Sequence, residues 1–154
     1  MTIDDAGPGL PTGAFIGRET FRALVRAALA RAAHEGWREL IVCDAGFQDW
    51  PLGERDCVDA LNAWVRAGGC QFTMLAQGYD EVVRRHARFV DWRRQWAHRI
   101  DCRVCAAADA RDLPSALWSP HWVMQRLDIL RSSGVSSAEP ERRLLLRELI
   151  DQWL

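Results

Sequence analysis

Two residues in the second half of the chain have side chains that could take part directly in chemistry. His121 and Asp128 stand seven positions apart, around a segment whose apolar residues predict a strand. An imidazole is one of the side chains that can act as a nucleophile. A histidine and an aspartate at this spacing also arise by chance, because so short a pattern has little specificity. The pair is therefore a candidate catalytic site, and chance remains the alternative interpretation.

An arginine-rich segment from Arg84 to Arg103 is the second candidate. It contains seven arginines and two histidines against two aspartates. The planar guanidinium suits phosphate groups, and neighbouring tryptophans could stack on bases, so the segment could form a groove for phosphate or single-stranded nucleic acid. The solvated face of an amphipathic helix would have the same composition. The candidate ligand-binding residues are Arg84, Arg85, Arg88, Arg93, Arg94 and His121.

The other reactive residue types in the sequence argue against metal or cofactor chemistry. The chain has no lysine, since all 20 basic residues are arginine, which excludes Schiff-base chemistry and the phosphate-binding lysine of a P-loop. Cys102 and Cys105 form a C-x-x-C pattern within a predicted strand, where residues three apart point to opposite faces. We therefore interpret the five cysteines as free thiols, and expect neither a metal nor a cofactor.

Three carboxylates, Asp44, Asp49 and Asp80, follow predicted strands. Open α/β sheets place ligands at this edge, and one or two of these oxygens could hold Mg²⁺. Such residues also cap helices and make turns, which is the interpretation that we favour.

The elements that must position these residues alternate between helix and strand periodicity. Helical spacing is expected from Phe21 to His34, from Gly53 to Gly68, from Asp80 through the arginine segment as one helix or two, and from Glu139 onward. Strands are expected at Glu39–Asp44, Gln71–Ala76, Ile100–Cys105 and Trp122–Ile129, with loops at Asp109–Pro120 and Ser132–Ser137. This order predicts one α/β layered domain over residues 15–154, with a mixed sheet and helices on both of its faces. The glycines and prolines of residues 1–14 predict a mobile tail.

Three segments carry a resemblance to a known family. They are the run from Leu40 to Leu52, the helix end Asn62-Ala63-Trp64, and the run from Arg84 to Arg94. Together they resemble an uncharacterised bacterial group of divergent phospholipase D-like domains, over roughly residues 18–154. Most members lack the intact catalytic pattern His-x-Lys-x4-Asp, in which the histidine attacks phosphorus and the lysine holds a non-bridging oxygen. In this chain His121 and Asp128 match that pattern, but Val123 stands in the lysine position, and the loss of such a cation typically costs about 10²-fold or more in rate.

The resemblance implies the half-barrel-like α/β fold of that superfamily, with two halves packed together, and hence a homodimer of this chain. Val123 stands in the lysine position, and charged residues are unevenly distributed along the chain. Together with these two features, the resemblance predicts a non-catalytic module that binds a phosphate-bearing ligand or a protein partner. The alternatives are a homodimeric phosphodiesterase or nuclease with a degenerate site at His121, and an arginine-mediated nucleic-acid binder. The longest apolar run is five residues and the start of the chain lacks a secretory pattern, so we expect no membrane span and a cytoplasmic location.

Overall fold

The computed structural model describes residues 9–106, 109 and 111–154 of the chain. Seven strands form one mixed sheet in the order β1-β7-β6-β5-β2-β3-β4. The strands β2, β3 and β4 pair in parallel, and the other pairs are antiparallel. Their bounds are Gly13–Phe15 (β1), Glu39–Cys43 (β2), Gln71–Ala76 (β3), Ile100–Val104 (β4), Ser115–Trp118 (β5), Val123–Asp128 (β6) and Ser133–Ser137 (β7).

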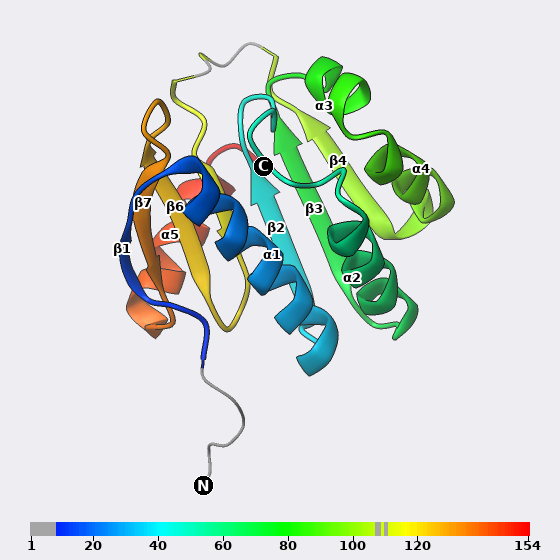
Figure 1. Ribbon diagram of the computed structural model, residues 1–154, viewed down its shortest axis with the longest axis horizontal. Coiled ribbons are helices and arrows are strands. Elements are labelled where there is room, and N and C mark those ends of the chain that lie inside the picture. Colours follow the sequence, from blue (N-terminus) through cyan, green and yellow to red (C-terminus); the bar gives the residue numbers. More distant parts are fainter. Residues whose placement is uncertain (1–8, 107–108, 110) are drawn as a thin grey trace, which may run out of the picture.

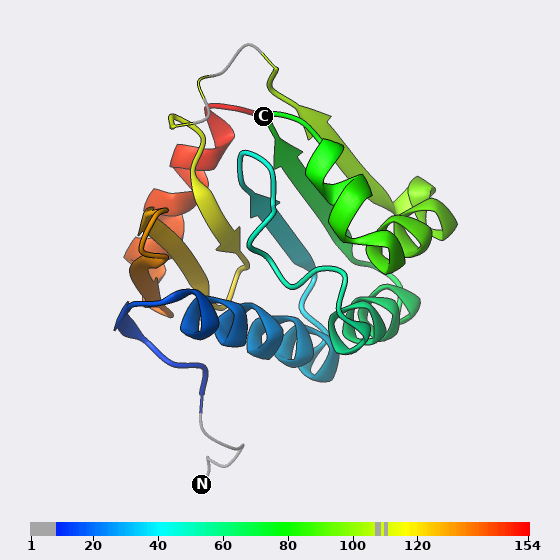
Figure 2. The ribbon, with the colours of Figure 1, turned by 45° about the horizontal axis from the view of Figure 1, so that its top comes forward.

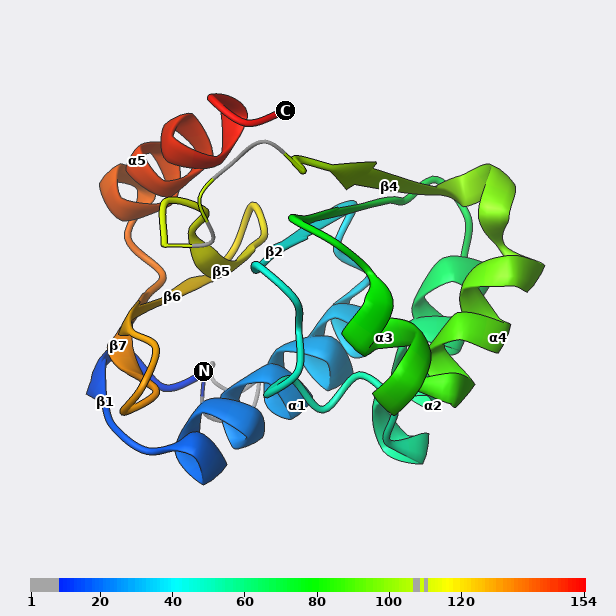
Figure 3. The ribbon, with the colours of Figure 1, turned by 90° about the horizontal axis from the view of Figure 1, so that it is seen from above.

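Helices cover both faces of this sheet, as expected for the predicted α/β layered domain (Figures 1 and 2). On one face lie α1 (Arg18–Glu35), α2 (Arg55–Arg66), α3 (Asp80–Arg85) and α4 (Ala87–Gln95), and α5 (Pro140–Asp151) lies on the other (Figure 3). A 3-10 turn, Ala97–Arg99, leads into β4. The arginine segment therefore includes the end of α3, the whole of α4 and the 3-10 turn, with a break between the two helices at His86, and it ends within β4. None of the helices in the described part of the chain combines the length and apolarity that crossing a bilayer requires.

The main core lies between the sheet and the four-helix layer. Its largest fully buried side chains include Trp50, Trp64 and Phe72. Trp50, Trp64 and Trp122 are all buried within the chain. A smaller apolar cluster joins α5 to β2, β5 and β6 on the other face.

Two strands lie where the sequence predicted loops, so that prediction was wrong. Ser115–Trp118 forms β5 inside the expected Asp109–Pro120 loop, and Ser133–Ser137 forms β7 inside the expected Ser/Gly loop. In β7 the small residues serve close packing, because a Cβ at Gly134 would lie 1.9 Å from the Gln125 carbonyl oxygen. Only glycine fits where the two strand backbones approach so closely.

The end of the expected N-terminal tail also belongs to the sheet. Gly13 and Ala14 pair with Ser136 and Val135 as part of β1, and the Pro11 carbonyl accepts the Trp122 indole N–H at 3.0 Å. These contacts fix a segment whose sequence shows no strand periodicity. Residues 1–8 of the predicted tail lie outside the described residues.

Candidate anion-binding cleft

The structure does not bring His121 and Asp128 together. His121 lies in the turn before β6, exposed and beside the Trp37 ring at 5.6 Å between centroids. Asp128 ends β6, where its carboxylate accepts the backbone N–H of Arg131. Asp128 is the last residue of the six-residue β6 and His121 lies two residues before that strand begins, so at roughly 3.3 Å per residue they are about 20 Å apart. The two side chains therefore cannot act on one substrate group within a single copy of the chain.

The candidate arginines divide into two groups. Arg84 and Arg94 are exposed on the outer sides of α3 and α4, where they pair with Glu81 and Asp91. The Arg93 guanidinium lies over the Tyr79 ring at 5.4 Å from its centroid and contacts the Cys102 thiol, so it is held against β4. The remaining two, Arg85 and Arg88, line a cleft.

This cleft lies at the end of the parallel strands where an α/β sheet usually binds ligands. It is bounded by α1, by α3 and α4, and by the loop of residues 44–54 that joins β2 to α2 and runs between α1 and α3 (Figure 3). Its volume is about 450 Å³ and it is lined by Arg22, Gln48, Trp50, Pro51, Gly53, Glu54, Arg85, His86 and Arg88. His121 and the Arg84, Arg93 and Arg94 side chains do not line it.

Three guanidinium groups from three different helices therefore meet at one cleft. Arg22 comes from α1, where its Nε–H donates to the Asp49 carbonyl at 2.8 Å. Arg88 donates from Nη1 to the Gly53 carbonyl at 3.3 Å, and Arg85 pairs through Nε with Glu81 at 3.1 Å. Within the described chain, the Nη groups of Arg22 and Arg85 have no protein acceptor, so they are free to bind an anion.

The loop that forms one wall of the cleft is held in a strained conformation. Phe47 has a positive φ of 61°, which is rare for a bulky residue and costs about 1–3 kcal/mol. Its N–H donates to Asp44 Oδ2 at 2.8 Å, and its carbonyl contacts His86 Nε2 at 2.8 Å. These two bonds clamp Phe47 from both sides and keep its ring fully buried against Trp50.

His86 is a buried neutral imidazole at the back of the cleft. Burial lowers its pKa below the ordinary value, and the charges of Arg22 and Arg85 lower this pKa further. The bond to the Phe47 carbonyl opposes that shift. The ring therefore stays uncharged at neutral pH, and the three arginines supply the positive charge of the cleft.

A buried ion cluster anchors the same loop from beneath. Arg126 of β6, with a side chain only 1% exposed, donates to Asp44 Oδ1 at 3.0 Å and to Asp49 Oδ2 at 3.1 Å. It also donates to the hydroxyls of Ser115 and Ser132, and its guanidinium lies 4.2 Å from the Phe21 ring centroid. Asp44 and Asp49 thus pair with a protein cation. This pairing does not fit the magnesium alternative. Asp44 Oδ2 also accepts the backbone N–H groups of Gly46 and Phe47, which is the turn role that we favoured for this residue.

The remaining reactive groups of the described residues are spread over different parts of the fold. The cysteines are free thiols, and burial raises the pKa of Cys57 to about 12. Cys102 packs on the main core and Cys105 on the opposite side of the sheet, which agrees with the prediction that the C-x-x-C residues point apart. Among residues 9–106, 109 and 111–154, no group of three metal-ligating side chains is found.

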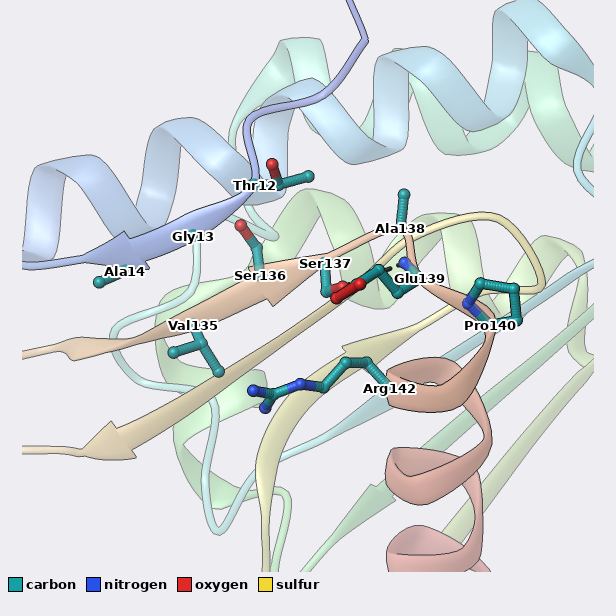
Figure 4. Close-up of a pocket in the computed structure, with 10 residues that line it drawn as sticks. All are labelled: Thr12, Gly13, Ala14, Val135, Ser136, Ser137, Ala138, Glu139, Pro140 and Arg142. Carbon is teal, nitrogen blue, oxygen red and sulfur yellow. Dashed lines mark hydrogen bonds between the residues drawn. The ribbon is translucent and has the colours of Figure 1, made fainter.

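A larger cavity lies on the other side of the molecule, and most of its lining residues are small or apolar. It has a volume of about 690 Å³ and lies between β1, β7 and the start of α5 (Figure 4). Arg142 extends along it toward Val135, and Glu139 donates its backbone N–H to the Ser137 hydroxyl. An adjoining apolar groove is lined partly by Leu145, which is 57% exposed.

Comparison with known proteins gives a likeness in fold. No family model and no curated protein matches the chain. Among solved structures, the chain is similar to TrmBL2, an archaeal chromatin protein whose structure is described as showing a novel mode of DNA binding. The TM-score is 0.62 at 14% identity, over 98% of this chain and 55% of that one. This chain therefore spans about half the length of TrmBL2 and shares the fold of that part.

Proposed function

We propose that this domain is a non-catalytic, phospholipase D-like module that binds an anionic, phosphate-bearing ligand in the cleft between α1, α3 and α4. The observation that carries the proposal is the convergence of Arg22, Arg85 and Arg88 at the carboxyl ends of β2 and β3. Guanidinium groups form charge-assisted hydrogen bonds with phosphate oxygens, and several from different elements fix the position of the anion.

The non-catalytic part of the proposal is supported by the surroundings of His121. Val123 replaces the lysine of the family pattern. The His121 ring packs beside Trp37, just before β2 begins, whereas the cleft lies beyond the end of β2. The nearby Arg143 guanidinium contacts the carbonyls of Pro120 and Ala138. These features speak against the alternative of a phosphodiesterase at His121.

Titration calorimetry with inorganic phosphate at low ionic strength tests the cleft. Replacing Arg85 and Arg88 together with glutamine removes two of the three cations that meet there. At about 1.5–3 kcal/mol for each charge-assisted hydrogen bond, the affinity is expected to fall at least about tenfold.

Arg84→Gln combined with Arg94→Gln is the matched control, because it also removes one positive charge from α3 and one from α4. Neither of these arginines lines the cleft. Unchanged binding in this control, with loss in the Arg85 and Arg88 variant, supports the cleft. Equal loss in both variants, or no phosphate binding by the native protein, refutes it.

Nucleic-acid binding is the second candidate, because the structural neighbour TrmBL2 binds DNA according to the description of its structure. The exposed arginines of α3 and α4 would then contact the phosphate backbone. Affinity for a single-stranded or double-stranded oligonucleotide should then fall steeply with salt, with a log–log slope set by the number of phosphates contacted. Here Arg84→Gln and Arg94→Gln should weaken binding, which distinguishes this candidate from a small-anion cleft.

Self-association is also part of the proposal, because the family resemblance implies that two halves pair. Light scattering across a range of protein concentrations tests it. A mass near twice 17.5 kDa supports the homodimer, and a concentration-independent 17.5 kDa contradicts it.

A further inference from the structure

His86 occupies a special place in the wall of the cleft. It lies at the break between α3 and α4, is only 5% exposed, and lines the cleft with Arg22 and Arg85. Its ring reaches across to the loop of residues 44–54 and contacts both halves of it. Nε2 lies 2.8 Å from the Phe47 carbonyl oxygen, and Nδ1 lies 3.1 Å from the Gly53 nitrogen.

These two contacts define the protonation state of the ring. A carbonyl oxygen can only accept, so Nε2 carries the proton, and the Gly53 N–H can only donate, so Nδ1 must be bare. The neutral Nε2–H tautomer satisfies both bonds. The imidazolium cannot, because a proton on Nδ1 would point at the Gly53 N–H.

The loop also leaves little room for the ring to move. A Cβ at Gly53 would lie 2.9 Å from His86 Cα and 3.1 Å from Nδ1, so the loop backbone packs directly on the histidine. Phe47, whose carbonyl the ring holds, is the residue with the strained φ. Loss of the ring contacts therefore removes one restraint at each end of the segment between Phe47 and Gly53, and leaves only the Asp44 bond to Phe47 and the Arg88 bond to Gly53 among the side-chain hydrogen bonds described for these two residues.

The charged groups around His86 come from every element packed against it. Arg22 faces it from α1, Arg85 and Glu81 from α3, and Arg88 from α4, and Glu54 lines the cleft where α2 begins. Most of these are cations, so a charged imidazole would be repelled as well as buried. Protonation must therefore be accompanied by movement of the ring or of the loop.

We propose that His86 is a positioning residue of the cleft. When neutral, it holds the loop so that the Asp49 carbonyl orients Arg22, and when protonated it releases the loop and weakens anion binding. This inference rests on the proposed anion-binding function. Protonation of His86 is therefore expected to lower the affinity for the anion. Simple electrostatics would give the opposite result, because an added positive charge beside an anion would strengthen binding.

Titration of sulfate at constant ionic strength between pH 8 and pH 5 tests the inference. Sulfate stays a dianion across this range, so any change in affinity comes from the protein. If binding requires a neutral His86, one proton is released as sulfate binds at low pH, and the affinity falls by up to about tenfold per pH unit below the pKa of this histidine. A sulfate affinity that rises as the pH falls, with the rise lost in variants of His86, overturns the proposal.

Two variants separate the two bonds of the ring. His86→Asn keeps an acceptor near the Nδ1 position, and His86→Gln keeps a donor near the Nε2 position, and neither side chain titrates. Both should lose the low-pH decline. The matched control is His98→Gln, since His98 is exposed beyond α4 and should leave the decline unchanged.

Nitrogen NMR of the native protein gives a readout that needs no ligand and no variant. The His86 ring should appear as the Nε2–H tautomer at pH 7, and its titration should shift the amide signals of Phe47 and Gly53. If sulfate binds at no pH, the proposed function fails, while this coupling still supports the positioning role. The opposite tautomer, or a ring that titrates without moving those two amides, overturns the inference whether or not sulfate binds.

Discussion

Replacing Arg126 with methionine tests whether the buried ion cluster holds the cleft loop in place. The substitution keeps an unbranched chain of similar reach and removes the cation from between Asp44 and Asp49. Removing one partner of a buried ion pair costs about 3–5 kcal/mol, because the remaining charge is left without compensation. The contact with the Phe21 ring is lost as well, and it adds about 1–2 kcal/mol where the cation is desolvated.

Two features reduce this cost. Asp44 keeps hydrogen bonds from the backbone N–H groups of Gly46 and Phe47, and the Asp49 side chain is 27% exposed, so water can solvate it. We therefore expect a loss of about 3 kcal/mol in the free energy of unfolding. For a domain of this size that lowers Tm by about 6–12 °C.

Urea denaturation followed by circular dichroism measures the loss. Arg126→Met with Asp44→Asn and Asp49→Asn is the compensating variant, because it removes the unpaired charges and should recover part of the stability. A loss below about 1 kcal/mol in the single variant would show that the cluster contributes little, and that other contacts hold the loop.

Three further expectations follow from packing and burial. Gly134→Ala should lower the free energy of unfolding by at least about 3 kcal/mol or prevent folding, since its Cβ would meet the Gln125 carbonyl. Gly78→Ala is the control: no atom lies within 4 Å of its Cβ, so the free energy of unfolding should change by less than about 0.5 kcal/mol, as urea denaturation would show. The pKa of His86 is lowered in the folded state, so the unfolded chain binds more protons below pH 6.5. The free energy of unfolding should therefore fall as the pH drops below 6.5, and a profile that is unchanged in His86→Gln would contradict this. Burial raises the pKa of Cys57 to about 12, so iodoacetamide at pH 8 should label it only after denaturation, and mass spectrometry of peptides from the native protein checks this.

The sequence was sufficient to predict the main helices and the parallel strands, because their apolar residues are continuous or recur at helical spacing. It did not predict β5 and β7. Ser115–Trp118 is only four residues long, and Ser133–Ser137 consists mostly of small residues that also occur in loops. Both strands exist because neighbouring strands offer them backbone partners, which no local pattern encodes.

The cleft was predicted only in part, for a related reason. Arg85 and Arg88 belonged to the arginine-rich segment, but Arg22 is one of four arginines on α1, and no sequence pattern distinguishes it from the other three. The partners of His86 are backbone groups 39 and 33 residues away, so sequence spacing could not identify them. Arg126 had a usable signal, since it stands two positions after the buried Met124 and therefore on the same inward face of β6. An arginine on that face requires acidic partners, and the acidic loop after β2 supplies them.

The position of Arg126 in the chain also determines when the cleft can become ordered. The residues that line the cleft all lie before position 89, yet the guanidinium that anchors its loop is separated from Asp44 by 82 residues and from Asp49 by 77. As the polypeptide leaves the ribosome, α1 and the parallel strands emerge well before this anchor. The binding surface therefore reaches its final shape only after the antiparallel half of the sheet has been synthesised and has docked. The proposed anion site would consequently be complete only on a chain that has finished this late step.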